Sequence, residues 1–178
     1  MILLKLLYFY IPVAIANTAP VLIKNHFKFL AVPIDKNKIW KGKEIFGSHK
    51  TWRGLIFATL CGGFVYLIQY YLAYKYPSFN NLPFDYFQAP MYFGFLFAAS
   101  AIIGDLIKSF VKRRFNIKPG KSWFPFDQID WVFGSLIFAV FYINIEIKII
   151  AVSILLFGLL HPIINLIGYY LGIKKNKF

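Results

Sequence analysis

The chain has 178 residues, of which 59% are hydrophobic and 21% aromatic, whereas only 15% are charged. A soluble domain carries about 25% charged residues, so this composition excludes an ordinary water-soluble globule and indicates an integral membrane protein. Lys and Arg number 20 against 7 Asp and Glu, and this positive excess has to be located before it is interpreted. The single cysteine, Cys61, lies in an apolar run, which excludes an internal disulfide and a Cys-based metal cluster.

Five apolar runs approach the ~20 residues that span a bilayer; they cover residues 2–23, 55–74, 91–111, 131–145 and 147–173. The third run carries Asp105 near its end, and the fourth is short unless its helix begins before Trp131. Four or six spans, or a cleaved leader in place of the first, are the alternatives. We predict an all-α fold, a polytopic membrane helix bundle of about five transmembrane helices, forming a single integral membrane domain over residues 1–178.

The basic residues are distributed unevenly between the two sides of such a bundle. Residues 17–53 contain eight of them, residues 108–130 contain six, and the tail at 174–177 contains three. The positive-inside rule then places the N-terminus outside, the C-terminus in the cytoplasm, and both long basic loops on the cytoplasmic face of the cell membrane. Because orientation accounts for the charge, no nucleic-acid partner is expected.

The third run ends in a polar stripe. If the segment is helical, Asp105, Ser109 and Lys112 follow one another at i, i+4 and i+7 and share one face. An ionisable residue near the membrane is costly, so its usual explanation is functional. The alternative is an ion pair of Asp105 with Lys108 or Lys112 that only ends the helix.

Two further carboxylates follow in the second basic loop. Pro125 is suited to begin a helix, which would place Asp127 and Asp130 one turn apart and opposite Asp105. Three carboxylates fit an all-oxygen Mg²⁺ site that is shared with substrate phosphates. A bare D-x-x-D is a weak motif, however, and the pair could equally be capping carboxylates without a metal.

The first basic loop ends in a segment rich in glycines, hydroxyls and cations, residues 42–54. Backbone N–H groups and positive charge just before a helix are suited to hold phosphate. The candidates for this role are Lys50, Thr51 and Arg53, next to the start of the second apolar run. The scattered lysines at 36, 38 and 41 are explained by the positive-inside rule alone.

The string S-F-V-K-R-R-F-N-I-K-P-G, followed by P-F-D-Q-I-D, resembles the signature of the CDP-archaeol synthase family, which is related to phosphatidate cytidylyltransferase. Asn17 and Pro20 at the end of the first run, and G-K-E-I-F-G-S-H-K-T-W-R-G in the first loop, are similar to the same family. Compared with the bacterial signature, Pro119 stands where an aspartate is expected and a His-Gly-Gly stretch is missing. These departures favour the archaeal branch.

The resemblance implies a nucleotidyltransferase that takes CTP and an unsaturated archaeal ether-lipid phosphate, releases pyrophosphate and requires Mg²⁺. It implies functional positions for Asp105, Ser109, Lys112, Arg113, Asp127 and Asp130. Together with the residue chemistry above, the predicted roles are as follows: Asp105, Asp127 and Asp130 for the metal; Lys112 with these three for catalysis; and Asn17, Lys50, Thr51, Arg53, Ser109, Lys112, Arg113 and Lys121 for substrate binding. Phosphatidic acid is the alternative acceptor. A transporter or a scaffold that binds anionic lipids is the non-enzymatic alternative, and a homodimer is left open.

Overall fold

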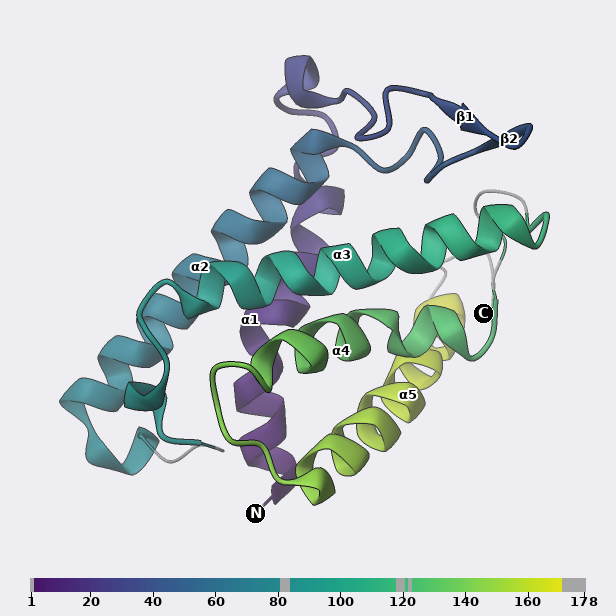
Figure 1. The fold of residues 1–178 in the computed structure, drawn as a ribbon. Helices are drawn as coiled ribbons and strands as arrows, with labels where there is room; N and C mark the ends of the chain where they lie inside the picture. The colour runs from purple at the N-terminus through teal and green to yellow at the C-terminus, as the bar shows by residue number, and fades with distance from the viewer. Residues whose placement is uncertain (1, 81–83, 118–120, 122, 171–178) are drawn as a thin grey trace.

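The computed structural model describes residues 2–80, 84–117, 121 and 123–170. Five helices build the molecule (Figure 1): α1 (Ile2–Leu22), α2 (Trp52–Lys75), α3 (Phe93–Arg114), α4 (Phe126–Ala139) and α5 (Ile147–Tyr170). Three short 3-10 helices, η1 (Lys28–Leu30), η2 (Pro77–Phe79) and η3 (Tyr86–Gln88), lie in the connections, and β1 (Ile39–Trp40) pairs with β2 (Lys43–Glu44) in an antiparallel hairpin. The all-α prediction is confirmed, with one small hairpin added.

Helix lengths refine the predicted spans. α1, α2 and α3 are long and apolar enough to cross a membrane, each with a mean hydropathy of 1.6. α4 has 14 residues, which is about 21 Å of helix against a hydrocarbon core of about 30 Å. The described apolar part of α5 is Ile147–Leu160. The end of the fifth predicted run and the basic tail, residues 171–178, lie outside the described residues.

The fourth apolar run, 131–145, does not give the bounds of its helix: the start predicted at Pro125 is confirmed, whereas the end of the run at Ile145 is wrong. The helix begins at Phe126 with Pro125 as its N-cap residue, and it ends at Ala139. Residues 140–146 make the reversal into α5. The sequence stays apolar as far as Ile143, so hydropathy alone does not mark the end of this helix.

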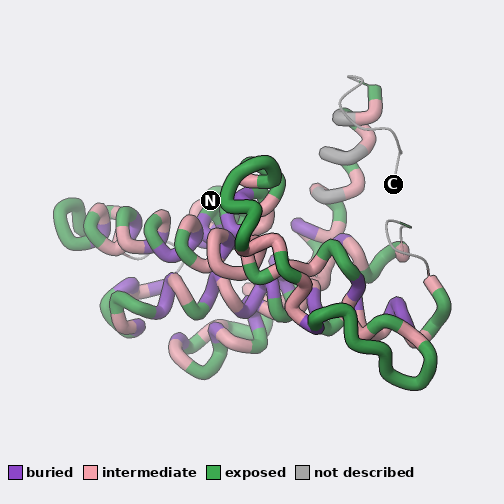
Figure 2. Tube along the Cα trace, turned by 90° about the horizontal axis from the view of Figure 1, so that it is seen from above, coloured by how far each residue is buried: buried purple, intermediate pink, exposed green. Residues whose placement is uncertain are grey.

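The core of the bundle is aromatic. Tyr10, Tyr66, Phe93 and Phe97 are almost completely buried, and Trp131 of α4 packs edge-on against Tyr10 at 5.8 Å between ring centroids. In Figure 2 the buried positions follow the inner faces of the helices, whereas the long loop after α1 is mostly exposed or intermediate. The bundle therefore keeps a fixed interior and presents its polar loops at the surface.

The loop between α1 and α2 is organised by a buried carboxylate. Asp35 accepts hydrogen bonds from the backbone N–H groups of Asn37 at 3.0 Å, Phe46 at 2.9 Å and Gly47 at 3.4 Å. Gly47 has φ of +102°, a conformation that favours glycine. Because Asp35 ties both ends of the hairpin together, the chain reaches Lys50 and the start of α2 in a defined path.

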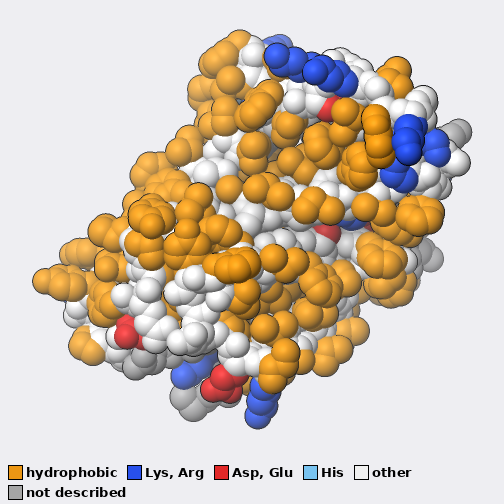
Figure 3. Space-filling model, in the orientation of Figure 1, with side chains coloured by type: hydrophobic (Ala, Val, Ile, Leu, Met, Phe, Trp, Pro, Cys, Tyr) orange, Lys and Arg blue, Asp and Glu red, His pale blue; other side chains and the backbone are white. Residues whose placement is uncertain are grey.

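This loop is attached to the C-terminal end of α3. The guanidinium of Arg114 donates to the carbonyl of Trp40 at 2.7 Å and of Glu44 at 2.6 Å, and it lies 5.0 Å from the centroid of the Trp40 ring. In return, Lys43 Nζ donates to the Arg114 carbonyl at 2.9 Å. The hairpin and the end of α3 therefore lie at the same end of the molecule, where Lys and Arg side chains gather in Figure 3.

Candidate functional site

Carboxylates and ammonium groups alternate where the C-terminal half of α3 meets the first turn of α4. The centre of this group is Lys108, whose Nζ lies 3.0 Å from Asp105 Oδ1. The same nitrogen lies 2.9 Å from Asp127 Oδ1 and 2.7 Å from Asp130 Oδ2. Three carboxylates from two helices thus converge on one positive charge.

Two more lysines flank the convergence. Lys50, from the loop before α2, donates to Asp105 Oδ2. Lys112 lies 3.1 Å and 3.0 Å from the two carboxylate oxygens of Asp127, and it also donates to the carbonyl of Lys121 at 2.5 Å. We call the six side chains of Lys50, Asp105, Lys108, Lys112, Asp127 and Asp130 the acid–lysine cluster; its three positive and three negative formal charges balance.

A pair of glycines lets the two helices approach closely enough to form the cluster. A Cβ added to Gly104 would lie 2.4 Å from the carbonyl oxygen of Asp130, and a Cβ added to Gly134 would lie 2.5 Å from the carbonyl oxygen of Ser100. Real side chains do not reach such distances, so any larger residue pushes α3 and α4 apart. This contact places Asp130 beside the stripe on α3.

Asp127 lies in the first turn of α4, at the loop end of a helix too short to cross the membrane. Burial opposes its ionisation, but hydrogen bonds and ion pairs with Lys108, the Trp123 N–H at 2.6 Å and Lys112 hold its pKa below the usual range. The carboxyl group is therefore ionised at neutral pH and available to a cation.

A cationic pocket lies beside the cluster. It encloses about 230 Å³ and is lined by Phe46, Gly47, His49, Lys50, Lys108, Ser109, Lys112 and Arg113. Arg113 is 8% exposed and its Nε has no hydrogen-bond partner, and no described residue forms an ion pair with its guanidinium. A buried, unpaired cation is costly, so the pocket is suited to bind an anion.

An apolar groove lies on the other side of Lys108, between α3 and α4. Its volume is about 500 Å³, and Ile107, Phe133 and Ile137 contribute to its walls, while Lys108 and Asp130 are the charged residues of its lining. Ile107 and Ile137 are 60% and 61% exposed. The groove thus opens along the helices and meets the cationic pocket at a shared residue.

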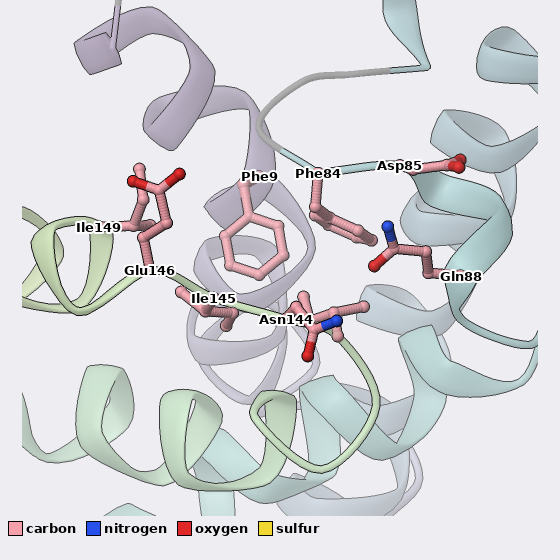
Figure 4. Close-up of a pocket in the computed structure, with 9 residues that line it drawn as sticks. Phe9, Phe84, Asp85, Gln88, Asn144, Ile145, Glu146 and Ile149 are labelled. Atoms are coloured by element: carbon pink, nitrogen blue, oxygen red, sulfur yellow. The ribbon is translucent and has the colours of Figure 1, made fainter.

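Figure 4 shows a different pocket, at the other ends of α3 and α4. Phe9, Phe84, Asp85, Gln88 and Glu146 are among its lining residues, and none of the lining residues in the described chain is Lys or Arg. Its acidic groups do not suit a phosphate. We therefore assign the candidate site to the acid–lysine cluster and the two cavities that share Lys108.

The structure brings together most of the predicted site residues. Asp105, Asp127, Asp130, Lys50 and Lys112 are in the cluster, and Ser109 and Arg113 line the adjacent pocket. The predicted stripe on α3 is helical, as expected, because Asp105, Ser109 and Lys112 all lie in that helix.

Four predicted residues have side chains outside the acid–lysine cluster and the cationic pocket. Thr51 caps α2 by accepting a hydrogen bond from the Gly54 N–H at 3.2 Å, and Arg53 donates to the carbonyl of His26 at 3.0 Å. Asn17 lies on α1, and its side chain makes no hydrogen bond with any described residue. Lys121 contributes its carbonyl to Lys112, and its own side chain is exposed. Their predicted roles in substrate binding stay predictions.

Sequence reasoning missed the central role of Lys108. Lys108 was considered only as a counter-ion of Asp105 at the end of the helix, although it stands three positions after Asp105, on the same helical face. Asp35 and the glycine pair were also missed. Gly104, directly before Asp105, and Gly134, four residues after Asp130, were the available signal for a close helix crossing.

The chemistry of the donor set, three carboxylates, suits a hard divalent cation, although an ammonium group now stands between them. Three carboxylate oxygens lie within 3.0 Å of one point, and such oxygens are the ligands that Mg²⁺ prefers. At that point stands the ammonium of Lys108. Among the described residues, no group of three or more His, Cys, Asp or Glu side chains is arranged to hold a metal directly.

The arrangement of the helices has a counterpart among solved structures. A structure described as an intramembrane enzyme for archaeal membrane lipid biosynthesis superposes with a TM-score of 0.71, at 24% identity, over 89% of this chain and 91% of that chain. The class defined by the fold is thus a helical bundle, here with three helices long and apolar enough to cross a membrane and a cationic pocket at one end.

The family follows from the sequence relatives. The family model for CarS-like CDP-archaeol synthase matches residues 1–178. The CDP-archaeol synthase of Methanoculleus marisnigri is 34% identical over 93% of this chain and 98% of its own, and that of Methanocaldococcus jannaschii is 34% identical over 94% and 93%. The chain belongs to the CDP-archaeol synthase family. It is a CTP-dependent cytidylyltransferase of membrane lipid synthesis, which sets aside the transporter and scaffold alternatives.

Proposed function

We propose that this enzyme transfers CMP from CTP to an unsaturated ether-lipid phosphate at the cytoplasmic face of the membrane, in a Mg²⁺-dependent reaction. The observation that carries the proposal is the position of Lys108, between a cationic pocket and an apolar groove. One cavity suits a polyphosphate and the other a hydrocarbon chain, so their shared boundary is where a lipid phosphate would meet a nucleotide.

The cationic pocket supports nucleotide binding. Lys50, Lys112 and Arg113 come from two separate segments of the chain and line one cavity. Arg113 has no counter-ion of its own in the described structure, and the guanidinium group is well matched to phosphate oxygens. We assign the triphosphate of CTP to this pocket, with Ser109 as an additional hydrogen-bonding group.

The apolar groove supports a lipid acceptor. Its lining is mostly apolar, and the charged residues in it are Lys108 and Asp130. If a lipid enters from the bilayer between α3 and α4, its phosphate would reach the acid–lysine cluster while its hydrocarbon chains stay in the membrane. Archaeal ether-lipid chains and the acyl chains of phosphatidic acid are both apolar and would both suit the groove. The activity assay described below distinguishes these two acceptors.

The carboxylates of the cluster would hold the metal. Asp127 and Asp130, with Asp105, are the residues we assign to Mg²⁺, which when bound would neutralise the charge of the nucleotide phosphates. Asp127 is held in place by the Trp123 N–H and by Lys112. A fixed ligand of this kind loses little entropy when a cation arrives.

The reaction then needs no side-chain nucleophile. An oxygen of the lipid phosphate attacks the α-phosphorus of CTP and forms a new P–O bond, while the bond from the α-phosphorus to the oxygen bridging to the β-phosphorus breaks. Pyrophosphate leaves with that bridging oxygen and its electron pair. Positioning and charge neutralisation by Lys50, Lys112 and Arg113 are the contributions of this chain.

The test is pyrophosphate release by the purified enzyme in detergent. Reactions with CTP or ATP, with an unsaturated archaeal-type ether-lipid phosphate or phosphatidic acid, and with or without Mg²⁺ separate the parts of the proposal. We expect release that requires CTP, Mg²⁺ and the ether lipid. Equal turnover with phosphatidic acid would overturn the acceptor assignment, and turnover without divalent ions would overturn the metal dependence.

Substitution of one carboxylate tests the metal ligands. Asp130→Asn should lower the turnover number by about 10²-fold or more, since a preorganised charge at the reacting centre is lost. Asp85→Asn, at the opposite ends of α3 and α4, is the matched control and should behave like the unmodified enzyme. Near-normal turnover of Asp130→Asn in saturating Mg²⁺ would exclude this residue as a ligand.

A further inference from the structure

Lys108 fills the position at which the three carboxylates meet. Its Nζ is within 3.0 Å of one oxygen from each of Asp105, Asp127 and Asp130, and its side chain is 15% exposed. We propose that Lys108 is a tethered stand-in for the divalent cation: its ammonium group holds the carboxylates together before the metal binds, and moves to the nucleotide phosphates when the metal arrives with CTP. This inference rests on the metal assignment of the proposed function.

The three carboxylates depend on Lys108 to different degrees. Asp105 is also paired with Lys50, and Asp127 with Lys112. For Asp130, the described residues provide Lys108 and the N–H of Trp131 at 2.8 Å, and no second cation. When Lys108 moves away, Asp130 is therefore the carboxylate with the largest unbalanced charge, and a divalent ion is bound most strongly there.

Charge balance explains why the metal would bind together with the nucleotide. The acid–lysine cluster has three cations and three anions, so a divalent ion added alone would leave an excess of two positive charges in a partly buried site. Such an excess is unfavourable in a medium of low polarity. The triphosphate of CTP supplies the missing negative charge, and it does so in the pocket that Lys108 already lines.

The movement requires no change in the backbone. Lys108 contributes to the walls of both the cationic pocket and the apolar groove. A lysine has a flexible stem and a compact charge, so rotation of its side chain carries the ammonium from the carboxylates toward Ser109 and Arg113. The same group would thus serve as counter-ion in one state and as phosphate ligand in the other.

The experiment measures binding of Mn²⁺ to the full chain in detergent, by the electron paramagnetic resonance signal of the free ion, without lipid. In the absence of CTP, Lys108→Met should bind Mn²⁺ at least about tenfold more tightly than the unmodified enzyme, because the competing ammonium is gone. CTP should tighten Mn²⁺ binding to the unmodified enzyme by a larger factor than in Lys108→Met. The control Lys38→Met removes an exposed loop lysine outside the cluster and should change neither value.

Equal or weaker Mn²⁺ binding by a folded Lys108→Met protein would overturn the proposal and leave Lys108 as a permanent ion-pair partner. If that variant loses its helical circular dichroism signal, Lys108→Arg provides the test. An arginine guanidinium binds carboxylates in a bidentate way and more strongly than an ammonium group. Mn²⁺ binding without CTP should therefore be weaker than in the unmodified enzyme. Unchanged binding would contradict the stand-in role.

The two proposals fail in different ways. Failure of the proposed function would appear as absence of Mg²⁺-dependent pyrophosphate release from the unmodified enzyme. Failure of the stand-in role would appear in the Mn²⁺ binding of the Lys108 variants, while the unmodified enzyme stays active.

Discussion

Arg113 and Lys112 are neighbours on α3, and both are buried, yet their surroundings differ. Lys112 is paired with Asp127 and bonded to a backbone carbonyl. The Arg113 guanidinium has no such partner among the described residues, and its Nε is buried without a hydrogen bond. A charge that the folded protein leaves uncompensated is destabilising by itself, which supports the proposed role of Arg113 in binding CTP.

This difference predicts that replacing Arg113 weakens CTP binding without lowering the thermal stability of the protein. Arg113→Gln should raise the KM for CTP by about tenfold to a hundredfold, the range for loss of a hydrogen bond to a charged group. The KM for the lipid should stay unchanged, and the melting temperature should stay the same or rise, because an unpaired buried charge is removed. A fall in melting temperature with an unchanged KM for CTP would show that Arg113 is structural.

At the scale of elements, the site depends on how closely α3 and α4 pack. Gly134→Ala places a methyl carbon 2.5 Å from Ser100 O and 2.9 Å from Gly104 Cα. The helices must separate, which displaces Asp130 relative to Asp105, and a shift of about 1 Å at a reacting centre costs on the order of 10²-fold in turnover.

The measurement is the turnover number together with the melting temperature. Gly158→Ala on α5 is the control, because its new methyl group would meet only the Ile129 side chain, at 3.2 Å. If Gly134→Ala keeps full turnover, the close crossing is dispensable and the carboxylates are held by the lysines alone.

The groove between the same two helices gives a prediction about the acceptor. Ile137→Trp adds bulk to its wall and should raise the KM for the lipid on the order of tenfold while leaving the KM for CTP unchanged. Leu155→Trp, on an exposed face of α5 that does not line the groove, is the matched control. An effect of similar size in both variants would place the acceptor elsewhere.

The sequence predicted the helices better than their contacts. Apolar runs marked α1, α2 and α3 to within a few residues, and Pro125 marked the start of α4. The end of α4 was missed because the chain stays apolar beyond Ala139, so hydropathy does not distinguish helix from turn there. The hairpin at Ile39–Glu44 was missed because its turn depends on the positive φ angles of Lys41 and Gly42.

For the site, residue chemistry predicted which residues take part, whereas the ion pairs between them depend on the fold. Asp105, Asp127 and Asp130 were predicted to meet, and they do so. Which cation would stand between them was not predictable, because Lys108 and Lys112 lie on the same helical face and differ by one turn. The roles of Thr51 and Arg53 were also beyond sequence reasoning, since both contacts depend on the path of the loop.

At the scale of the whole molecule, the orientation in the membrane is a prediction of its own. Both basic loops lie at one end of the bundle, joined by Arg114 and Lys43, and the positive-inside rule assigns that end to the cytoplasm. In a Cys61→Ala background, Ser78→Cys should react with a membrane-impermeant maleimide in intact cells. Lys38→Cys should react only after permeabilisation, and the reverse pattern would invert the topology.

The residues of the acid–lysine cluster come from both halves of the chain, in unequal numbers. All three carboxylates and the two lysines on α3 come from the second half, whereas Lys50 comes from the first, before α2. During membrane insertion the α1–α2 pair therefore precedes every acidic group of the site. We therefore expect Lys50 to be in place at the membrane surface before Asp105 is synthesised, so that a counter-charge is available to Asp105 from the start.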